Sequence, residues 1–143
     1  MSYVNKVLAC PGRILIVDDD QDNRELLQII LKWDGFITLT ANGGAQALTI
    51  AAAEQPDLIL LDLMMPDLDG YEVTALLKSG IATQHIPVVI ISAMNDSATQ
   101  LRLLSAGVQD FICKPIDRLD LCRRVKHIIA RKPGAPPRDY DAA

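Results

Sequence analysis

The sequence predicts a single α/β domain with three layers, in which a parallel β-sheet lies between two layers of helices. Three segments are apolar on both faces, at 14–17, 58–61 and 88–91. Such segments are typical of strands buried between helices on both sides of a parallel sheet. Strand-like and helix-like segments also alternate five times, which favours right-handed strand–helix–strand crossovers. The length of 143 residues suits one domain with a substantial core.

The first predicted elements follow an N-terminal extension at 1–12 that shows no clear pattern. Residues 14–17 form the first strand. Residues 23–33 carry apolar side chains at helical spacing and predict an amphipathic helix with a broad buried face. Asp22 and Glu25 have the spacing of a capping box, which would place the start of this helix at Asp22.

The remaining elements continue the alternation up to residue 131. Residues 67–70, Asp-Leu-Asp-Gly, have turn chemistry. They also resemble the start of a calcium loop, but the later ligand positions are missing, so a turn is preferred. Further strands are predicted at 36–40, 57–61, 88–91 and 110–113, and further helices at 44–54, 71–78, 97–106 and 119–131.

The domain is therefore predicted to span residues 13–131. The segment 132–143 is rich in Pro and in small and polar residues, and it predicts a flexible tail or linker. The chain is expected to be either a stand-alone domain or part of a larger protein.

Composition and charge exclude several functional classes. The net charge is −4 and no basic segment stands out, so direct binding of nucleic acid by this chain is not expected. No apolar run reaches the length of a membrane span, and no membrane association is expected. The three cysteines, Cys10, Cys113 and Cys122, share no metal or redox spacing and predict free thiols in the cytoplasm.

Chemically active residues follow four of the five predicted strands. Asp18 and Asp19 follow the first strand, and Asp62 ends the third. Ser92 ends the fourth strand and Lys114 follows the fifth. Because the carboxyl ends of parallel strands gather at one edge of the sheet, we expect these side chains to form one site.

This set of residues predicts chemistry with a metal ion and a phosphoryl group. Two carboxylates about 4 Å apart repel by about 4 kcal/mol at an effective dielectric constant near 20, so clustering them requires a cation or a proton. Mg²⁺ prefers oxygen ligands and commonly binds one or two carboxylates together with phosphate. A carboxylate beside Mg²⁺, a hydroxyl group and a lysine is suited to attack and accept a phosphoryl group.

The sequence resembles the receiver domain of response regulators in two-component signalling over about residues 13–131. The resemblance is carried by four motifs taken together. They are Ile14-Leu-Ile-Val-Asp-Asp-Asp20, Asp57-Leu-Ile-Leu-Leu-Asp-Leu-Met-Met-Pro-Asp-Leu-Asp-Gly70, Pro87-Val-Val-Ile-Ile-Ser-Ala93 and Phe111-Ile-Cys-Lys-Pro115. The resemblance implies a flavodoxin-like fold with strand order 2-1-3-4-5.

The resemblance also implies a role for each residue of the site. Asp62 would be the phosphoacceptor, and Asp19 and Asp62 would bind Mg²⁺ directly. Asp18 would act on the metal mainly through water, and the backbone carbonyl of Met64 would be a further ligand. Asp20 is expected to cap a helix or face solvent rather than bind the metal.

The resemblance further implies a switch. Ser92 would supply the hydroxyl group and Lys114 would pair with the phosphoryl group, before a cis peptide bond to Pro115. Phe111 lies at the position of the switch aromatic residue, although plain core packing explains it equally well.

The expected function is a bacterial signalling switch that receives a phosphoryl group from a histidine kinase or a histidine phosphotransfer protein and acts on an unidentified effector. It would have only self-phosphorylation and self-dephosphorylation chemistry and would not be an enzyme otherwise. A homodimer through the fourth helix, fifth strand and fifth helix is a further expectation.

Two alternatives belong to other functional classes. A Mg²⁺-dependent phosphohydrolase with an aspartyl nucleophile typically carries a general acid two residues after the nucleophile, where this sequence has Met64. An FMN-binding protein would place its phosphate loop after the first strand, where three consecutive aspartates would repel the phosphate.

Overall fold

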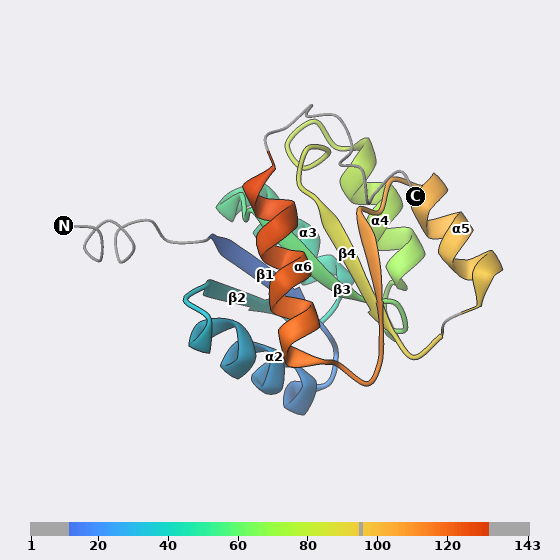
Figure 1. Cartoon of the computed structure of the whole chain (residues 1–143). Helices are drawn as coiled ribbons and strands as arrows, with labels where there is room; N and C mark the ends of the chain where they lie inside the picture. The colour runs from blue at the N-terminus through green and yellow to red at the C-terminus, as the bar shows by residue number, and fades with distance from the viewer. Residues whose placement is uncertain (1–11, 95, 132–143) are drawn as a thin grey trace.

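The computed structural model describes residues 12–94 and 96–131, which form a five-stranded sheet with helices on both faces (Figure 1). Strands and helices alternate along the whole described chain. The strands are β1 (Arg13–Val17), β2 (Ile37–Ala41), β3 (Leu58–Asp62), β4 (Val88–Ser92) and β5 (Asp110–Cys113). The helices are α2 (Gln21–Trp33), α3 (Gly44–Glu54), α4 (Gly70–Ser79), α5 (Ser97–Ser105) and α6 (Arg118–Ala130).

The strand order is β2-β1-β3-β4-β5, and all four pairings are parallel. The predicted three-layer fold and its strand order are therefore confirmed. In register, Val17 at the end of β1 lies opposite Leu61 of β3, while Asp62 lies opposite Ile91 of β4. The carboxyl ends of β1, β3 and β4 consequently meet at one edge of the sheet.

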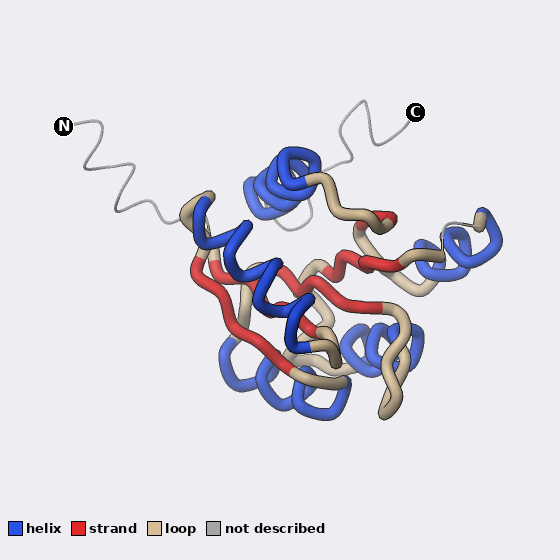
Figure 2. Tube along the Cα trace, turned by 90° about the horizontal axis from the view of Figure 1, so that it is seen from below, coloured by secondary structure: helices blue, strands red, loops and turns tan. Residues whose placement is uncertain are grey.

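The two faces of the sheet bury separate apolar cores because side chains alternate between faces along each strand. Leu15, Val17, Ile59 and Leu61 pack with buried residues of α3, α4 and α5. Their neighbours in β1 and β3 face the opposite way and pack with α2 and α6. Figure 2 shows the sheet between these two layers of helices.

The start of α2 differs from the predicted capping box. Asp20 is the N-cap, and its side chain accepts hydrogen bonds from the backbone N–H groups of Asp22 and Asn23. Asp22 lies inside the first turn, where a negative charge is favourable near the helix N-terminus. The prediction was wrong by two residues because several acids in this segment suit a cap position. The expectation that Asp20 caps a helix is confirmed.

The other predicted elements lie within one or two residues of the observed ones. The chain bends at residues 67–68 and enters α4 at Gly70, and Asp69 and Glu72 make a capping box at the start of that helix. The extension at 1–11, including Cys10, and the tail at 132–143 lie outside the described residues. No helix in the described part of the chain has the length and apolar character needed to cross a membrane.

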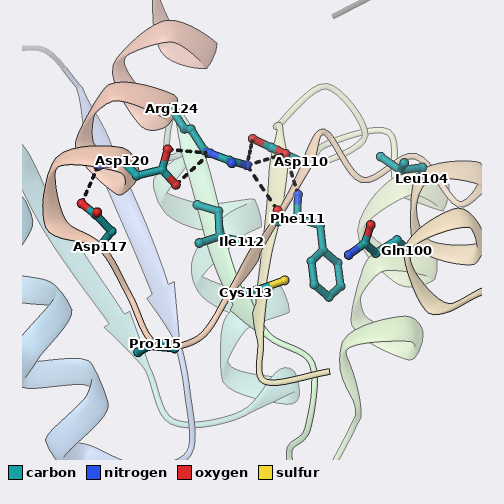
Figure 3. A pocket seen from close by; sticks show the side chains of 10 residues that line it. All are labelled: Gln100, Leu104, Asp110, Phe111, Ile112, Cys113, Pro115, Asp117, Asp120 and Arg124. Atoms are coloured by element: carbon teal, nitrogen blue, oxygen red, sulfur yellow. Dashed lines mark hydrogen bonds and ion pairs between the residues drawn. The ribbon is translucent and has the colours of Figure 1, made fainter. Parts of the chain in front are cut away.

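A pocket of about 480 Å³ lies on the face formed by α5, β5 and α6 (Figure 3). Phe111 is half-buried there, lines the pocket and also packs against the core under α3, α4 and α5. Arg124 of α6 pairs with Asp110 at 3.2 Å and with Asp120 at 3.1 Å. Phe111 therefore lies between the core and the pocket, next to the ion pairs that Arg124 makes with Asp110 and Asp120.

Candidate functional site

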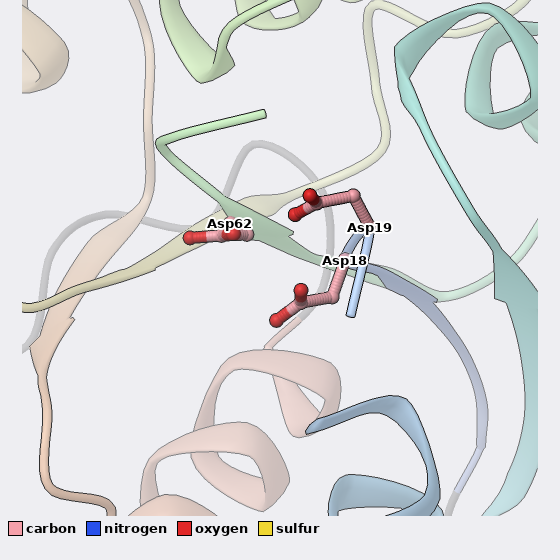
Figure 4. A group of neighbouring side chains, drawn as sticks. All are labelled: Asp18, Asp19 and Asp62. Carbon is pink, nitrogen blue, oxygen red and sulfur yellow. The ribbon is translucent and has the colours of Figure 1, made fainter. Parts of the chain in front are cut away.

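Asp18, Asp19 and Asp62 form an acidic pocket at the carboxyl edge of the sheet (Figure 4). One carboxylate oxygen from each lies within 4.8 Å of the others. Asp18 and Asp62 are only 3% and 8% exposed, whereas Asp19 faces solvent. The acidic pocket therefore combines two buried carboxylates with a third, that of Asp19, which is exposed to solvent.

The position of Asp18 is fixed by the neighbouring segments. Its backbone N–H donates to the carbonyl of Ala41 at the end of β2, at 3.2 Å. Its carboxylate accepts a hydrogen bond from the N–H of Asp20 at 2.9 Å. Arg24 of α2 donates from its guanidinium group to the carbonyl of Asp18 at 2.7 Å. The turn between β1 and α2 thus presents the first carboxylate in a defined orientation.

Lys114 and Ser92 complete the predicted site on the side of β4 and β5. The Lys114 Nζ atom lies 3.9 Å from Oδ1 of Asp62. Ser92 is buried, and its hydroxyl oxygen accepts a hydrogen bond from the N–H of Met94 at 3.1 Å. The N–H of Lys114 donates to the Ser92 carbonyl at 2.9 Å. The peptide bond from Lys114 to Pro115 is cis, as expected.

The loop after β3 carries Met64. The Met64 side chain is 63% exposed, and its N–H lies 3.5 Å from Oδ1 of Asp62. The loop is closed where the N–H of Gly70 donates to the carbonyl of Leu63 at 2.7 Å. Met64 therefore lies at the rim of the acidic pocket, with its backbone next to the Asp62 carboxylate.

Burial and, after it, the nearby negative charge of Asp18 together raise the pKa of Asp62 to about 6. The Lys114 ammonium group and the Met64 N–H oppose this shift in pKa. Ionising Asp62 in the folded protein therefore costs free energy, and a bound cation would offset that cost.

We expect this shift to make the stability of the metal-free protein depend on pH. The pKa of Asp62 rises from its usual 3.8 when unfolded to about 6 when folded. The folded state therefore retains a proton that the unfolded state loses between about pH 4 and pH 6, and stability falls as pH rises through that window. Solvent and salt screen the open edge, so we expect a loss of about 1–2 kcal/mol relative to Asp62→Asn.

Urea unfolding of both proteins in EDTA, at intervals from pH 4 to pH 8, measures this difference. The Asn variant cannot ionise at this position and corrects for all other titrating groups. Parallel pH profiles for the two proteins would contradict the assignment.

The acidic pocket fits a Mg²⁺ ion by the chemistry of its donors. Carboxylate oxygens converge from two strands, and hard oxygen ligands of this kind suit Mg²⁺ rather than softer metals. Asp18, Asp19, Asp62 and the carbonyl of Met64 are the groups in this region that could hold it.

Sequence reasoning missed two contacts near the acidic pocket. One is the bond from Arg24 to the Asp18 carbonyl. The other joins Asp67 to the start of α3, where its carboxylate accepts the N–H groups of Gly44 and Ala45, each at 3.2 Å. The contact of Asp67 joins residues more than 20 positions apart, and no local spacing pattern indicates it. The contact of Arg24 spans only six residues, but the spacing does not show that a side chain at that position will reach a backbone carbonyl.

Comparison with known proteins decides the family. The family model described as the response regulator receiver domain matches residues 14–126. The chain belongs to this family. The fold, with its acidic pocket at the carboxyl edge of the sheet, is that of a receiver domain, and such domains are phosphorylation-dependent signalling switches rather than classical enzymes. Receiver domains generally bind Mg²⁺ at an acidic site of this kind.

Curated relatives are longer than this chain. It is 43% identical over 117 residues to the response regulator PleD of Caulobacter vibrioides, covering 82% of this chain and 26% of PleD. It is 38% identical over 124 residues to the DNA-binding response regulator MtrA of Mycobacterium tuberculosis, covering 87% of this chain and 53% of MtrA. The chain therefore spans about a quarter to a half of these relatives.

Solved structures show the same fold. A receiver domain of a histidine kinase from Syntrophus aciditrophicus matches with a TM-score of 0.77 and 32% identity, covering 88% of this chain and 98% of that one. A receiver domain of a sensor histidine kinase from Pseudomonas aeruginosa PAO1 matches with a TM-score of 0.78 and 28% identity, covering 84% and 98%. The latter was solved with a magnesium ion coordinated in its active-site cleft.

Proposed function

We propose that this receiver domain accepts a phosphoryl group on Asp62, with Mg²⁺ in the acidic pocket, from a histidine kinase or a histidine phosphotransfer protein. The observation that carries this proposal is the placement of Asp62. It is a buried carboxylate at a strand end, clustered with Asp18 and Asp19 and 3.9 Å from the Lys114 ammonium group. A carboxylate in these surroundings is both costly to ionise and well placed to attack phosphorus.

The residues would divide the reaction between them. A carboxylate oxygen of Asp62 attacks the phosphorus, the nitrogen–phosphorus bond of the donor breaks, and its imidazole leaves with the bonding electrons. Asp19, Asp62 and the Met64 carbonyl would hold Mg²⁺, with Asp18 acting through water, and Lys114 would pair with a phosphoryl oxygen. Bound Mg²⁺ supplies positive charge that offsets the charge on the transferred group.

Ser92 and Phe111 would convert this chemistry into a surface change. The Ser92 hydroxyl group is buried at the end of β4, and Phe111 on the adjacent strand is half-buried beside the α5–β5–α6 pocket. A new phosphoryl group on Asp62 offers strong acceptors that would draw the Ser92 hydroxyl toward it. The β4–α5 turn would follow, and Phe111 would move inward.

No observation favours the two alternative classes. The side chain two residues after Asp62 is that of Met64, which cannot transfer a proton as a phosphohydrolase would require. Asp18 and Asp19 occupy the turn in which an FMN phosphate would lie, and their charges would repel it.

Measuring Mg²⁺ affinity in variants of the acidic pocket tests this proposal directly. We expect the wild-type protein to bind Mg²⁺ and Asp19→Ala to bind it more than tenfold more weakly, because a carboxylate ligand and its charge are lost. Isothermal titration calorimetry measures both affinities. Asp20→Ser retains a side-chain oxygen at the N-cap of α2 while removing an acid next to the pocket, so it should stay close to wild type. Undiminished affinity in Asp19→Ala would contradict the proposed ligand set.

The switch can be tested with beryllofluoride, a mimic of the phosphoryl group. We expect amide NMR spectra of the Mg²⁺-loaded protein to change across about residues 92–114 when beryllofluoride is added. In Ser92→Ala, beryllofluoride should still shift the signals of residues near Asp62, but the changes around Phe111 should shrink. Changes confined to the acidic pocket in the wild-type protein would argue against a coupled switch.

The domain would work in the cytoplasm of a bacterium, where its kinase phosphorylates it, and would pass the signal to an effector on the same or another chain. The α5–β5–α6 face would serve that contact or a homodimer. With a net charge of −4, this chain would not bind nucleic acid directly.

A further inference from the structure

The loop between β3 and α4 is attached to a distant part of the chain through Asp67. Its two carboxylate oxygens accept the N–H groups of Gly44 and Ala45, the first two residues of α3. The N-cap of this helix is Gly43, which has no side chain to satisfy these groups. Asp67 therefore caps a helix that begins 23 residues earlier in the sequence.

The glycines at the start of α3 leave room for this contact. A Cβ atom on Gly43 would lie only 2.9 Å from an oxygen of Asp67. A Cβ atom on Gly44 would lie 2.6 Å from a methyl group of Val73 and 2.7 Å from Cβ of Leu68. The carboxylate and the loop can approach the helix this closely only because both positions lack a side chain. We call the contact of Asp67 with Gly43, Gly44 and Ala45 the loop clasp.

The loop clasp connects the two sides of the acidic pocket. On one side, Asp67 lies three residues after Met64 and five after Asp62. On the other side, α3 begins three residues after the end of β2, where the carbonyl of Ala41 accepts the N–H of Asp18. The hydrogen bonds of Asp67 to the start of α3 and of Asp18 to Ala41, together with the intervening chain, thus link Asp62 to Asp18.

The negative charge of Asp67 favours its contact with the N-terminus of α3. The N–H groups of Leu68, Ala45 and Gly44 hold the pKa of Asp67 below its usual value. A carboxylate at a helix N-terminus is also favoured by the helix dipole. The lowered pKa and the position at the helix N-terminus both favour the ionised carboxylate that makes this contact.

We propose that Asp67 is a positioning residue for the phosphorylation site: the loop clasp fixes the distance between the turn that carries Asp18 and Asp19 and the loop that carries Met64. This rests on the proposed function of the acidic pocket. Loss of the loop clasp leaves Asp62 on its strand but frees the segment that supplies the Met64 carbonyl, and the metal site loses its preformed geometry. Residues that orient metal ligands typically change metal affinity substantially when they are removed.

Four variants test this proposal, each measured for Mg²⁺ affinity by calorimetry and for unfolding in urea. Asp67→Ala removes the loop clasp and should weaken Mg²⁺ binding about five- to tenfold. Gly43→Ala keeps the charge of Asp67 but pushes its carboxylate away from the helix, and it should also weaken Mg²⁺ binding. Asp67→Asn removes the charge but keeps one of the two oxygen acceptors, and its loss of affinity should be smaller than that of Asp67→Ala.

Asp57→Ala is the matched control at the opposite edge of the sheet. Its exposed carboxylate accepts the N–H of Arg13 at 2.8 Å, so the variant also loses an acid and a contact to a backbone N–H group. Its Mg²⁺ affinity should match that of wild type. Hydrogen exchange at Gly44 and Ala45 should accelerate in Asp67→Ala, and in wild type it should slow further when Mg²⁺ binds.

The outcomes separate the possible explanations. Equal Mg²⁺ affinities for Asp67→Ala and Asp57→Ala, at temperatures where both are fully folded, would overturn the proposal and leave Asp67 as a purely structural cap. Weak binding in both Asp67 variants with normal binding in Gly43→Ala would overturn it in favour of a long-range charge effect. If the wild-type protein binds no Mg²⁺, the proposed function itself fails, and this result differs from either of the others.

Discussion

Asp62→Asn should take up no phosphoryl group from acetyl phosphate and Mg²⁺ under conditions in which the wild-type protein gains one. The amide cannot attack phosphorus, and the variant also loses one of the charges that would attract the metal. Asp18 is an unsuitable substitute nucleophile because its carboxylate accepts the N–H of Asp20 and is held by that bond. Intact mass measurement after incubation distinguishes the two proteins.

The control for this experiment makes the same chemical change at the other end of β3. Asp57→Asn alters an exposed side chain at the opposite edge of the sheet and should gain the phosphoryl group like wild type. Misfolding does not explain the expected loss, because Asp62→Asn removes a carboxylate that is costly to ionise and should be at least as stable as wild type above about pH 6. A gain of one phosphoryl group by Asp62→Asn would show that another residue accepts it.

Gly70→Ala should destabilise the fold by about 2–3 kcal/mol, because an added Cβ atom clashes with backbone that cannot move away freely. A Cβ atom at this position would lie 2.8 Å from Cα of Leu63 and 3.3 Å from the carbonyl oxygen of Asp62. The clash falls on the residue that follows the proposed phosphoacceptor. The substitution should therefore also slow phosphorylation in the protein that remains folded.

Gly80→Ala is the matched control at the other end of α4. Its closest contact would be the hydroxyl oxygen of Thr83, which belongs to a side chain and not to backbone. We expect a smaller loss of stability there and a normal rate of phosphorylation. Urea unfolding and the rate of mass gain with acetyl phosphate measure both effects. Similar stability losses at Gly70 and Gly80 would contradict the clash at β3.

The sequence was sufficient to predict the fold because its strongest signals are local. Strands β3 and β4 are apolar on both faces, and this pattern is hard to satisfy outside a sheet covered by helices on both sides. Once the strands are parallel, their carboxyl ends gather at one edge, and Asp18, Asp19 and Asp62 follow as a cluster. The strand order itself came from the family resemblance, since periodicity does not determine it.

Of the features that escaped prediction, one is local and two depend on contacts between distant segments. The local feature is the N-cap of α2, which is Asp20 and not Asp22; both acids, two residues apart, suit a cap position in sequence. The loop clasp of Asp67 joins α3 to the loop after β3, and neither segment alone indicates the other. The position of Phe111 between core and pocket likewise depends on how α5 packs, and the sequence allowed either setting.

The most direct test of the central claim is to locate the phosphoryl group on the wild-type protein. The protein is phosphorylated with acetyl phosphate and Mg²⁺, and borohydride then reduces the acyl phosphate and leaves homoserine in place of the modified aspartate. Peptide mass spectrometry reads the position of that residue. We expect homoserine at position 62, formed only when Mg²⁺ is present. Homoserine at position 18 or 19, or a modification that forms equally well without Mg²⁺, would contradict it.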